Sequence, residues 1–131
     1  MRNTPQEFYG QMAVKTDSMH NKRIGAKGEA LASKYLKKHG YKIVEKNYKN
    51  PFGEVDIIVF KDGVTAFVEV KTRLSDKFGA PSESVGKARQ FKYIQGANFY
   101  FNGREIDCTV RFDIIEVFRD GINHIENAFQ A

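Results

Sequence analysis

The stretch GEVDIIVFKDGVTAFVEVKTR, Gly53 to Arg73, decides the fold, because two β-forming runs flank a single Asp62-Gly63 pair. Asp-Gly between apolar runs is a strong hairpin signal and favours a two-residue type I′ turn. Such a turn places Lys61 opposite Val64 and sets the register of the whole hairpin. The facing pairs that it predicts are Phe60 with Thr65, Ile58 with Phe67, Asp56 with Glu69, and Glu54 with Lys71.

This register gives the hairpin two different faces, because strand side chains alternate between the sides of a sheet. The predicted buried layer comprises Val55, Ile57, Val59, Ala66, Val68 and Val70. The other face sets Asp56 against Glu69, and like charges directly opposite each other are destabilising. A shared proton, the neighbouring Lys71 or a divalent cation would relieve that repulsion.

A divalent cation explains this carboxylate pair best. Mg²⁺ is commonly held by one or two carboxylates and keeps waters that a phosphate oxygen can replace. With Lys71 on the same face, the cluster is a candidate site for phosphodiester hydrolysis. The alternative is a solvated outer face with ordinary ion pairs, and the apolar Ile58, Phe60 and Phe67 on that face argue against it.

The rest of the chain predicts helices packed on a mixed sheet. Apolar periodicity predicts a first helix over about residues 22–39 and a second over about 85–101, with Val85, Ala88, Phe91, Ile94 and Phe101 toward a core. Strands are expected over residues 41–48, in the two arms of the hairpin, and over 109–118 and 122–129. The order α-β-β-β-α-β-β is of α/β class, and the long crossover through the second helix requires one parallel strand pair.

Length and composition predict one small intracellular domain. The chain has 131 residues, of which 41% are hydrophobic; we expect a single domain over residues 21–131 behind a flexible N-terminal extension, residues 1–20. One cysteine excludes an intramolecular disulfide. No stretch approaches the roughly 20 apolar residues that span a bilayer, so a soluble, cytoplasmic protein is expected. A net charge of +5 favours an anionic partner.

The residues also resemble a known family. Asp56, twelve residues, then Glu69-x-Lys71 resembles the PD-(D/E)xK nuclease signature, with Val55 in place of its proline. The chain as a whole resembles the UPF0102 family, also called YraN, which is similar to archaeal Holliday-junction resolvases of restriction-endonuclease-like fold. The matching pieces are GAKGEALASKYLKKHGY, GEVDIIV, FVEVKTR, the lysine of VGKARQ, RFDIIEV and HIENAF.

This resemblance implies a nuclease site with Mg²⁺ or Mn²⁺. It implies that Asp56 and Glu69 bind the metal, that the Val70 carbonyl adds a backbone ligand, and that Lys71 is the catalytic lysine. It also singles out Glu29 of the first helix, as a metal ligand that often acts through water. Taken without the family, Glu29 reads as a carboxylate on a helix surface.

Basic residues predict where a nucleic acid would bind. Residues 21–49 hold nine Lys or Arg against two Glu, and positive charge is the footprint of phosphate binding. The candidate phosphate contacts are Lys22, Arg23, Lys27, Arg73 at the end of FVEVKTR, and Lys87, which matches a basic position of the family. The alternative for Lys87 is a solvated helical lysine.

Three hypotheses follow. The first is a metal-dependent endonuclease acting on DNA, with a preference for branched or junction-like substrates. The second is a nucleic-acid-binding module without catalysis. The third is a scaffold that acts as a homodimer in DNA processing. The repulsion of Asp56 against Glu69 favours the enzyme, because a binding module has no need of it.

Overall fold

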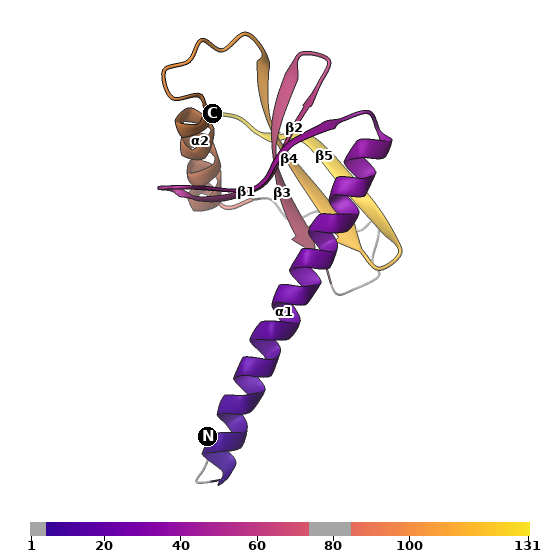
Figure 1. The fold of residues 1–131 in the computed structure, drawn as a ribbon, viewed down its shortest axis with the longest axis vertical. Helices are drawn as coiled ribbons and strands as arrows, with labels where there is room; N and C mark the ends of the chain where they lie inside the picture. The colour runs from indigo at the N-terminus through magenta and orange to yellow at the C-terminus, as the bar shows by residue number, and fades with distance from the viewer. Residues whose placement is uncertain (1–4, 74–84) are drawn as a thin grey trace.

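The fold is a five-stranded sheet with a helix on each face (Figure 1). The computed structural model describes residues 5–73 and 85–131, and side chains within residues 22–73 and 85–131. The elements, in chain order, are α1 (Pro5–Lys38), β1 (Lys42–Asn50), β2 (Gly53–Lys61), β3 (Val64–Thr72), α2 (Lys87–Phe101), β4 (Thr109–Phe118) and β5 (Gly121–Phe129). This order confirms the α/β class.

The strands lie side by side in sequence order, and one of their four pairings is parallel. β3 and β4 form that parallel pair, and α2 lies in the crossover between them. The other three pairings are antiparallel. The predicted parallel pair is therefore confirmed, because a parallel return needs a long connection and only this crossover provides one.

The first helix is longer than its apolar pattern indicates. α1 begins at Pro5, whereas the periodicity predicts a start near Lys22. Proline is tolerated in the first turn of a helix, where its missing N–H has no partner to lose. The apolar stripe marks only the part that packs on the sheet, with Ala32 and Leu36 fully buried there, and so it does not locate the start of the helix. Whether residues 1–20 are flexible stays a prediction, and residues 1–4 lie outside the described residues.

The predicted register of the central hairpin is confirmed up to its open end. Asp62 and Gly63 have φ values of 50° and 78°, as a type I′ turn requires. The pairs run from Lys61 with Val64 to Ile57 with Val68. The recorded pairing ends there, so Asp56 and Glu69 are not a ladder pair, and that part of the prediction is wrong.

Both faces of the sheet are buried, which corrects the prediction of one buried layer. One core cluster, including Ile57 and Val59, packs under α1, and a second, including Ile58 and Phe67, packs under α2. Val55 belongs to the α2 cluster instead of lying with Ile57. Strands covered by helices on both sides bury both sets of alternating side chains.

A close approach of α1 to β3 fixes the first helix on the sheet. A Cβ added at Gly28 would lie 1.9 Å from Thr72 Oγ1, so only glycine fits without a shift of the helix or of Thr72. At Gly25, by contrast, an added Cβ meets nothing within 4 Å among the described residues. The close approach of this helix to the sheet therefore depends on Gly28 and not on Gly25.

A buried ionic cluster ties β4 to β5. Asp113 is fully buried and accepts hydrogen bonds from Arg111 at 2.8 and 2.9 Å, from His124 Nε2 at 2.8 Å and from the Asn127 N–H at 3.0 Å. Burial alone would raise the pKa of Asp113, but the bonds from His124 and Arg111 and the Asn127 N–H outweigh it and hold that pKa below 3.8. The pairing of β4 with β5 shifts register beside Asp113, and its carboxylate satisfies the amide that this shift frees.

The close approach gives a matched pair of stability tests. We expect Gly28→Ala to lower the free energy of unfolding by about 1–3 kcal/mol, because the added methyl overpacks the contact with Thr72. Gly25→Ala is the control, and it should leave stability unchanged or raise it by about 0.5–1 kcal/mol, since alanine favours a helix. Urea denaturation of both variants checks this, and equal effects would contradict the packing argument.

The ionic cluster predicts a loss of stability in acid. Asp113→Asn should lower the free energy of unfolding at neutral pH by about 3–5 kcal/mol, because it leaves Arg111 without its buried partner. Since the folded-state pKa of Asp113 is lowered, its contribution is present above about pH 3.8 and is lost as the pH falls through the folded value. Urea unfolding of both proteins at several pH values should show the difference shrinking below pH 3.8; a constant difference would contradict it.

Candidate active site

The site forms where β2 and β3 stop pairing. Beyond Ile57 and Val68, the Val70 N–H donates to the Asp56 carboxylate at 2.8 Å. In a continued antiparallel ladder, that N–H would bond to a backbone carbonyl of β2. The side chain of Asp56 thus stands where a backbone acceptor would be, and it is fixed at the opening between the strands.

Tyr93 of α2 bridges β2 and β3 at this point, from the face of the sheet that α2 covers. Its hydroxyl accepts the Asp56 N–H at 3.2 Å and donates to the Val68 carbonyl at 3.4 Å. The side chain is 1% exposed, and burial raises the pKa of Tyr93 well above 10. The hydroxyl therefore keeps its proton and bridges the two strands where their own pairing has ended.

Glu69 is buried beside Asp56 without a full set of partners. It is 7% exposed, and its Oε1 has no hydrogen-bond partner among the described residues. Arg89 Nε of α2 lies 3.5 Å from that oxygen; this is close enough for an ion pair, but the geometry is not that of a hydrogen bond. A buried carboxylate oxygen left in this way is unfavourable unless a cation or proton reaches it.

The charges of the two carboxylates are strongly disfavoured. Burial raises the pKa of Asp56 to about 7; the Val70 N–H opposes this, and the charges of Glu29 and Glu69 add to it. Burial also raises the pKa of Glu69, and the charges of Arg89 and Lys71 lower it. Like-charged neighbours and low exposure are the expected causes of such shifts, and they concentrate at functional sites.

Glu29 lies near Asp56 and is held in place by a hydrogen bond from β1. It accepts a hydrogen bond at 2.9 Å from Asn47 of β1, which has a positive φ of 51°, and its charge acts on Asp56. Within the part of the chain that the structure describes, no three His, Cys, Asp or Glu side chains converge as a metal-binding group. The charges of Glu29 and Glu69 both act on Asp56, that of Glu29 the more strongly, and Val70 and Lys71 follow Glu69 in β3.

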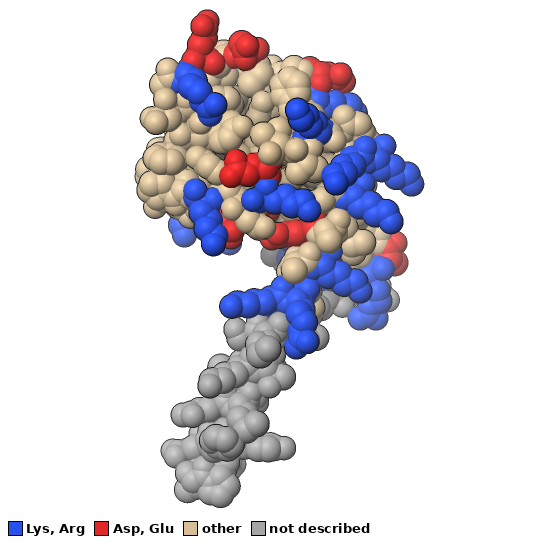
Figure 2. Space-filling view, in the orientation of Figure 1, with Lys and Arg blue, Asp and Glu red and all other residues tan. Residues whose placement is uncertain are grey.

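The predicted phosphate contacts divide into exposed and paired residues. Lys22, Arg23 and Lys27 are exposed on α1, and Lys87 is exposed at the start of α2. Figure 2 shows Lys and Arg side chains gathered along the described part of α1. Arg73 differs, because it donates to the buried Glu116 at 3.0 Å, and this ion pair ties the end of β3 to β4.

The core prediction for the second helix is confirmed for Val85, Ile94 and Phe101, which belong to or pack against the α2 cluster. It is wrong for two other residues, and it missed the α2 residues at the site. The predicted core residues Ala88 and Phe91 are exposed, Phe91 to 57%, whereas Tyr93, Gly96 and Ala97 are buried. Apolar residues lie on more than one side of α2, so their spacing does not fix which side packs. The spacing of Arg89 and Tyr93, four residues apart on one helical face, was the available signal.

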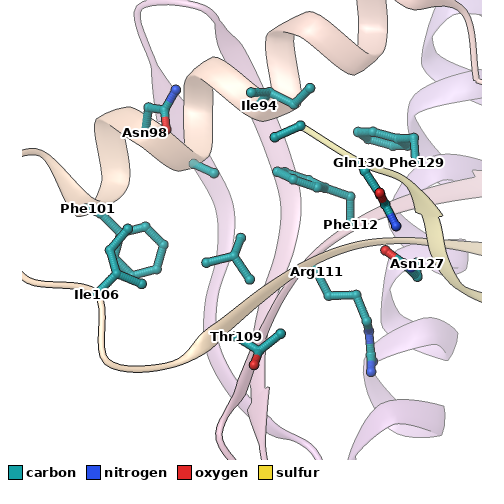
Figure 3. A pocket seen from close by; sticks show the side chains of 13 residues that line it. Ile94, Asn98, Phe101, Ile106, Thr109, Arg111, Phe112, Asn127, Phe129 and Gln130 are labelled. Carbon is teal, nitrogen blue, oxygen red and sulfur yellow. The ribbon is translucent and has the colours of Figure 1, made fainter.

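A pocket lies away from these carboxylates. This pocket of about 540 Å³ opens between α2 and the paired ends of β4 and β5, and its walls are mostly apolar (Figure 3). The described residues that line it include Ile94, Phe101, Phe112 and Phe129, and none of the predicted site residues is among them. It plays no part in the chemistry derived below.

The raised pKa of Asp56 predicts an unusual pH dependence of stability. Because the folded-state pKa is about 7 and the ordinary value is 3.8, the folded state binds more protons between these values, and stability falls as the pH rises through them. In EDTA, the free energy of unfolding of Asp56→Asn should lack this dependence on pH. Its advantage over the wild type should therefore grow by on the order of 2–4 kcal/mol as the pH rises from 5 to 8.

Urea denaturation at pH 5, 6.5 and 8 checks this expectation. Asp107→Asn, an exposed carboxylate in the loop before β4, is the control and should follow the wild type. If the free energies of unfolding of Asp56→Asn and the wild type change with pH in parallel, Asp56 does not bind a proton in this pH range, and the prediction is wrong.

Comparison with known proteins places the chain in a family. The model of the uncharacterised protein family UPF0102 matches residues 28–117. A UPF0102 protein of Thermodesulfovibrio yellowstonii is 47% identical over 106 residues, which cover 81% of this chain and 95% of the relative. UPF0102 proteins of Clostridium perfringens and Geobacter metallireducens are 46% and 43% identical, over 86% of this chain and 98% and 97% of theirs. The matched span includes Glu29, Asp56, Glu69 and Lys71, and the chain belongs to the UPF0102 family.

Proposed function

We propose that this protein is a nuclease that hydrolyses phosphodiester bonds in DNA with Mg²⁺ or Mn²⁺, and that it acts on branched or junction-like substrates. The observation that carries the proposal is the half-buried Asp56 beside the buried Glu69 where β2 and β3 stop pairing. A fold selected for stability alone would replace such a pair, because neighbouring carboxylates of low exposure repel each other and lose part of their hydration.

The residues present fit a divalent cation. Glu69 Oε1 is buried and has no hydrogen-bond partner among the described residues, and the pKa of Asp56 is raised to about 7 by burial. Hard cations take oxygen ligands from carboxylates, backbone carbonyls and water. Asp56 and Glu69 would hold the cation, with the Val70 carbonyl as a backbone ligand and Glu29 acting through water.

The cation and the protein residues would contribute different parts of the hydrolysis. A bound Mg²⁺ or Mn²⁺ supplies Lewis acidity toward the phosphate and lowers the pKa of a water molecule. Lys71 carries a positive charge that acts on Glu69, and its ammonium would orient the attacking water or stabilise the developing anion. Exposed Lys22, Arg23 and Lys27 would hold the DNA backbone beside the site.

A non-catalytic nucleic-acid-binding module is the second candidate. It is favoured by one observation, that no three potential metal ligands converge within the described residues. The exposed basic residues of α1 serve that function equally well, since phosphate binding needs charge and not a metal. The module accounts for the basic surface but gives no role to the repulsion between Asp56 and Glu69.

Cleavage assays separate the two candidates. The wild type should cut at least one of linear, flapped and four-way DNA with Mg²⁺ or Mn²⁺, and Asp56→Ala should lower the rate on the order of 10²-fold or more, because it removes a metal ligand. Asp107→Ala is the matched control. RNA versions of the substrates test the choice of nucleic acid.

Two results would reject the nuclease. Cleavage that survives in EDTA or in Asp56→Ala would exclude this metal site. Salt-dependent binding without cleavage of any substrate would favour the module.

Metal binding also has a readout in stability. Mg²⁺ should raise the melting temperature of the wild type, because a ligand that binds only the folded state stabilises it by mass action. Asp56→Asn should show no such rise, since it has lost one of the two anionic ligands. Differential scanning fluorimetry with increasing Mg²⁺ measures both, and equal shifts would place the cation elsewhere.

A further inference from the structure

Arg89 is the cation that α2 brings to the carboxylate pair. It is the third residue of α2, and its Nε lies 3.5 Å from the buried Glu69 Oε1. Burial raises the pKa values of Asp56 and Glu69, and the charge of Arg89 opposes this rise at both. Its guanidinium therefore partly neutralises the pair.

The contact is a loose one. An arginine that is committed to a carboxylate usually donates two hydrogen bonds at about 2.7–2.9 Å, as Arg111 does to Asp113. Arg89 makes no such bond to Glu69, and its side chain remains 55% exposed. The first turn of α2 offers it no acidic partner within the helix, so among the described residues little besides Glu69 holds the guanidinium in this place.

We propose that Arg89 is an exchangeable counter-ion, which neutralises Glu69 in the metal-free protein and moves to a phosphate of the bound nucleic acid once a divalent cation occupies the carboxylates. This inference rests on the proposed nuclease function and adds a residue that positions substrate.

The exchange follows from electrostatics. A guanidinium at Glu69 lowers the negative potential that attracts a divalent cation, so it weakens metal binding. A cation on the carboxylates in turn repels the guanidinium, and the long exposed side chain can turn outward. A DNA phosphate at the same site is the anion that it would then meet, and arginine suits phosphate through its planar set of donors.

Arg89→Gln therefore has two effects of opposite sign. Without the competing charge, the variant should bind Mn²⁺ more tightly than the wild type, by roughly two- to fivefold for an exposed ion pair. Without the phosphate contact, the variant should bind DNA more weakly by a similar factor when Ca²⁺ occupies the carboxylates. In EDTA the loss should be smaller, because Arg89 then stays at Glu69 in the wild type too. Loss of a merely structural residue would not raise the affinity for Mn²⁺ while lowering the affinity for DNA.

The control is Lys92→Gln, one turn further along α2. Lys92 is exposed, and its side chain lies beside Gly53; its replacement changes the net charge by the same amount. Arg89→Lys keeps the positive charge, so its affinity for Mn²⁺ should stay close to that of the wild type. Free Mn²⁺ is measured by electron paramagnetic resonance at low ionic strength, where charge effects are least screened, and DNA binding by fluorescence anisotropy. Circular dichroism checks the folding of each variant.

Each outcome has one meaning. Tighter Mn²⁺ binding together with weaker DNA binding in Arg89→Gln, and neither in Lys92→Gln, supports the exchange. Unchanged or weaker Mn²⁺ binding overturns it while leaving the nuclease proposal intact. Tighter Mn²⁺ binding with unchanged DNA binding overturns the move to phosphate. If the wild type neither binds Mn²⁺ nor cleaves DNA, the proposed function fails, and this inference fails with it.

Discussion

The site depends on one hydrogen bond, from the Val70 N–H to the carboxylate of Asp56. A side chain takes the place of a backbone acceptor there, so the pairing of β2 with β3 ends at Ile57 and Val68. Beyond that point no backbone ladder joins the two central strands. A ladder between central strands would leave no room there for water or a ligand. Asp56 and Glu69 stand at that opening on a rigid sheet, and rigid support is what a precise site needs.

The two helices hold this opening from opposite faces. Tyr93 of α2 bridges Asp56 and Val68 with its hydroxyl, and it does so from a fully packed position. On the other face, Gly28 lets α1 approach Thr72 at the end of β3. That contact also fixes the next residue, Glu29, near Asp56. Packing at one glycine thus determines where a charged side chain lies.

The carboxylates of low exposure differ between the structural cluster at Asp113 and the candidate site. Asp113 has donors from Arg111, His124 and a backbone amide, and its pKa is lowered although burial alone would raise it. Burial raises the pKa values of Asp56 and Glu69, and Glu69 Oε1 has no hydrogen bond among the described residues. A network with all its partners stabilises the fold, whereas an incomplete one is open to an added cation or proton.

The sequence by itself determined the class of the fold, the order of the elements and the register of the hairpin. These follow from local rules, because Asp62-Gly63 fixes its turn chemically and alternation fixes which side chains share a face. The sequence also identified Asp56, Glu69 and Lys71 as a cluster, since their spacing is set within one hairpin. The positions of Arg89 and Tyr93 were not accessible in this way, because two faces of α2 are apolar and only packing selects one.

Only the tertiary structure decided how the carboxylates are presented. A continued ladder would have set Asp56 directly across from Glu69, but the bond to the Val70 N–H ends the pairing before that point. The tertiary structure also decided that both faces of the sheet are covered, which buries Ile58 and Phe67 beside the charged residues. The physical reason is the same in each case: local sequence sets which residues can face each other, whereas burial and competing hydrogen bonds set which of them do.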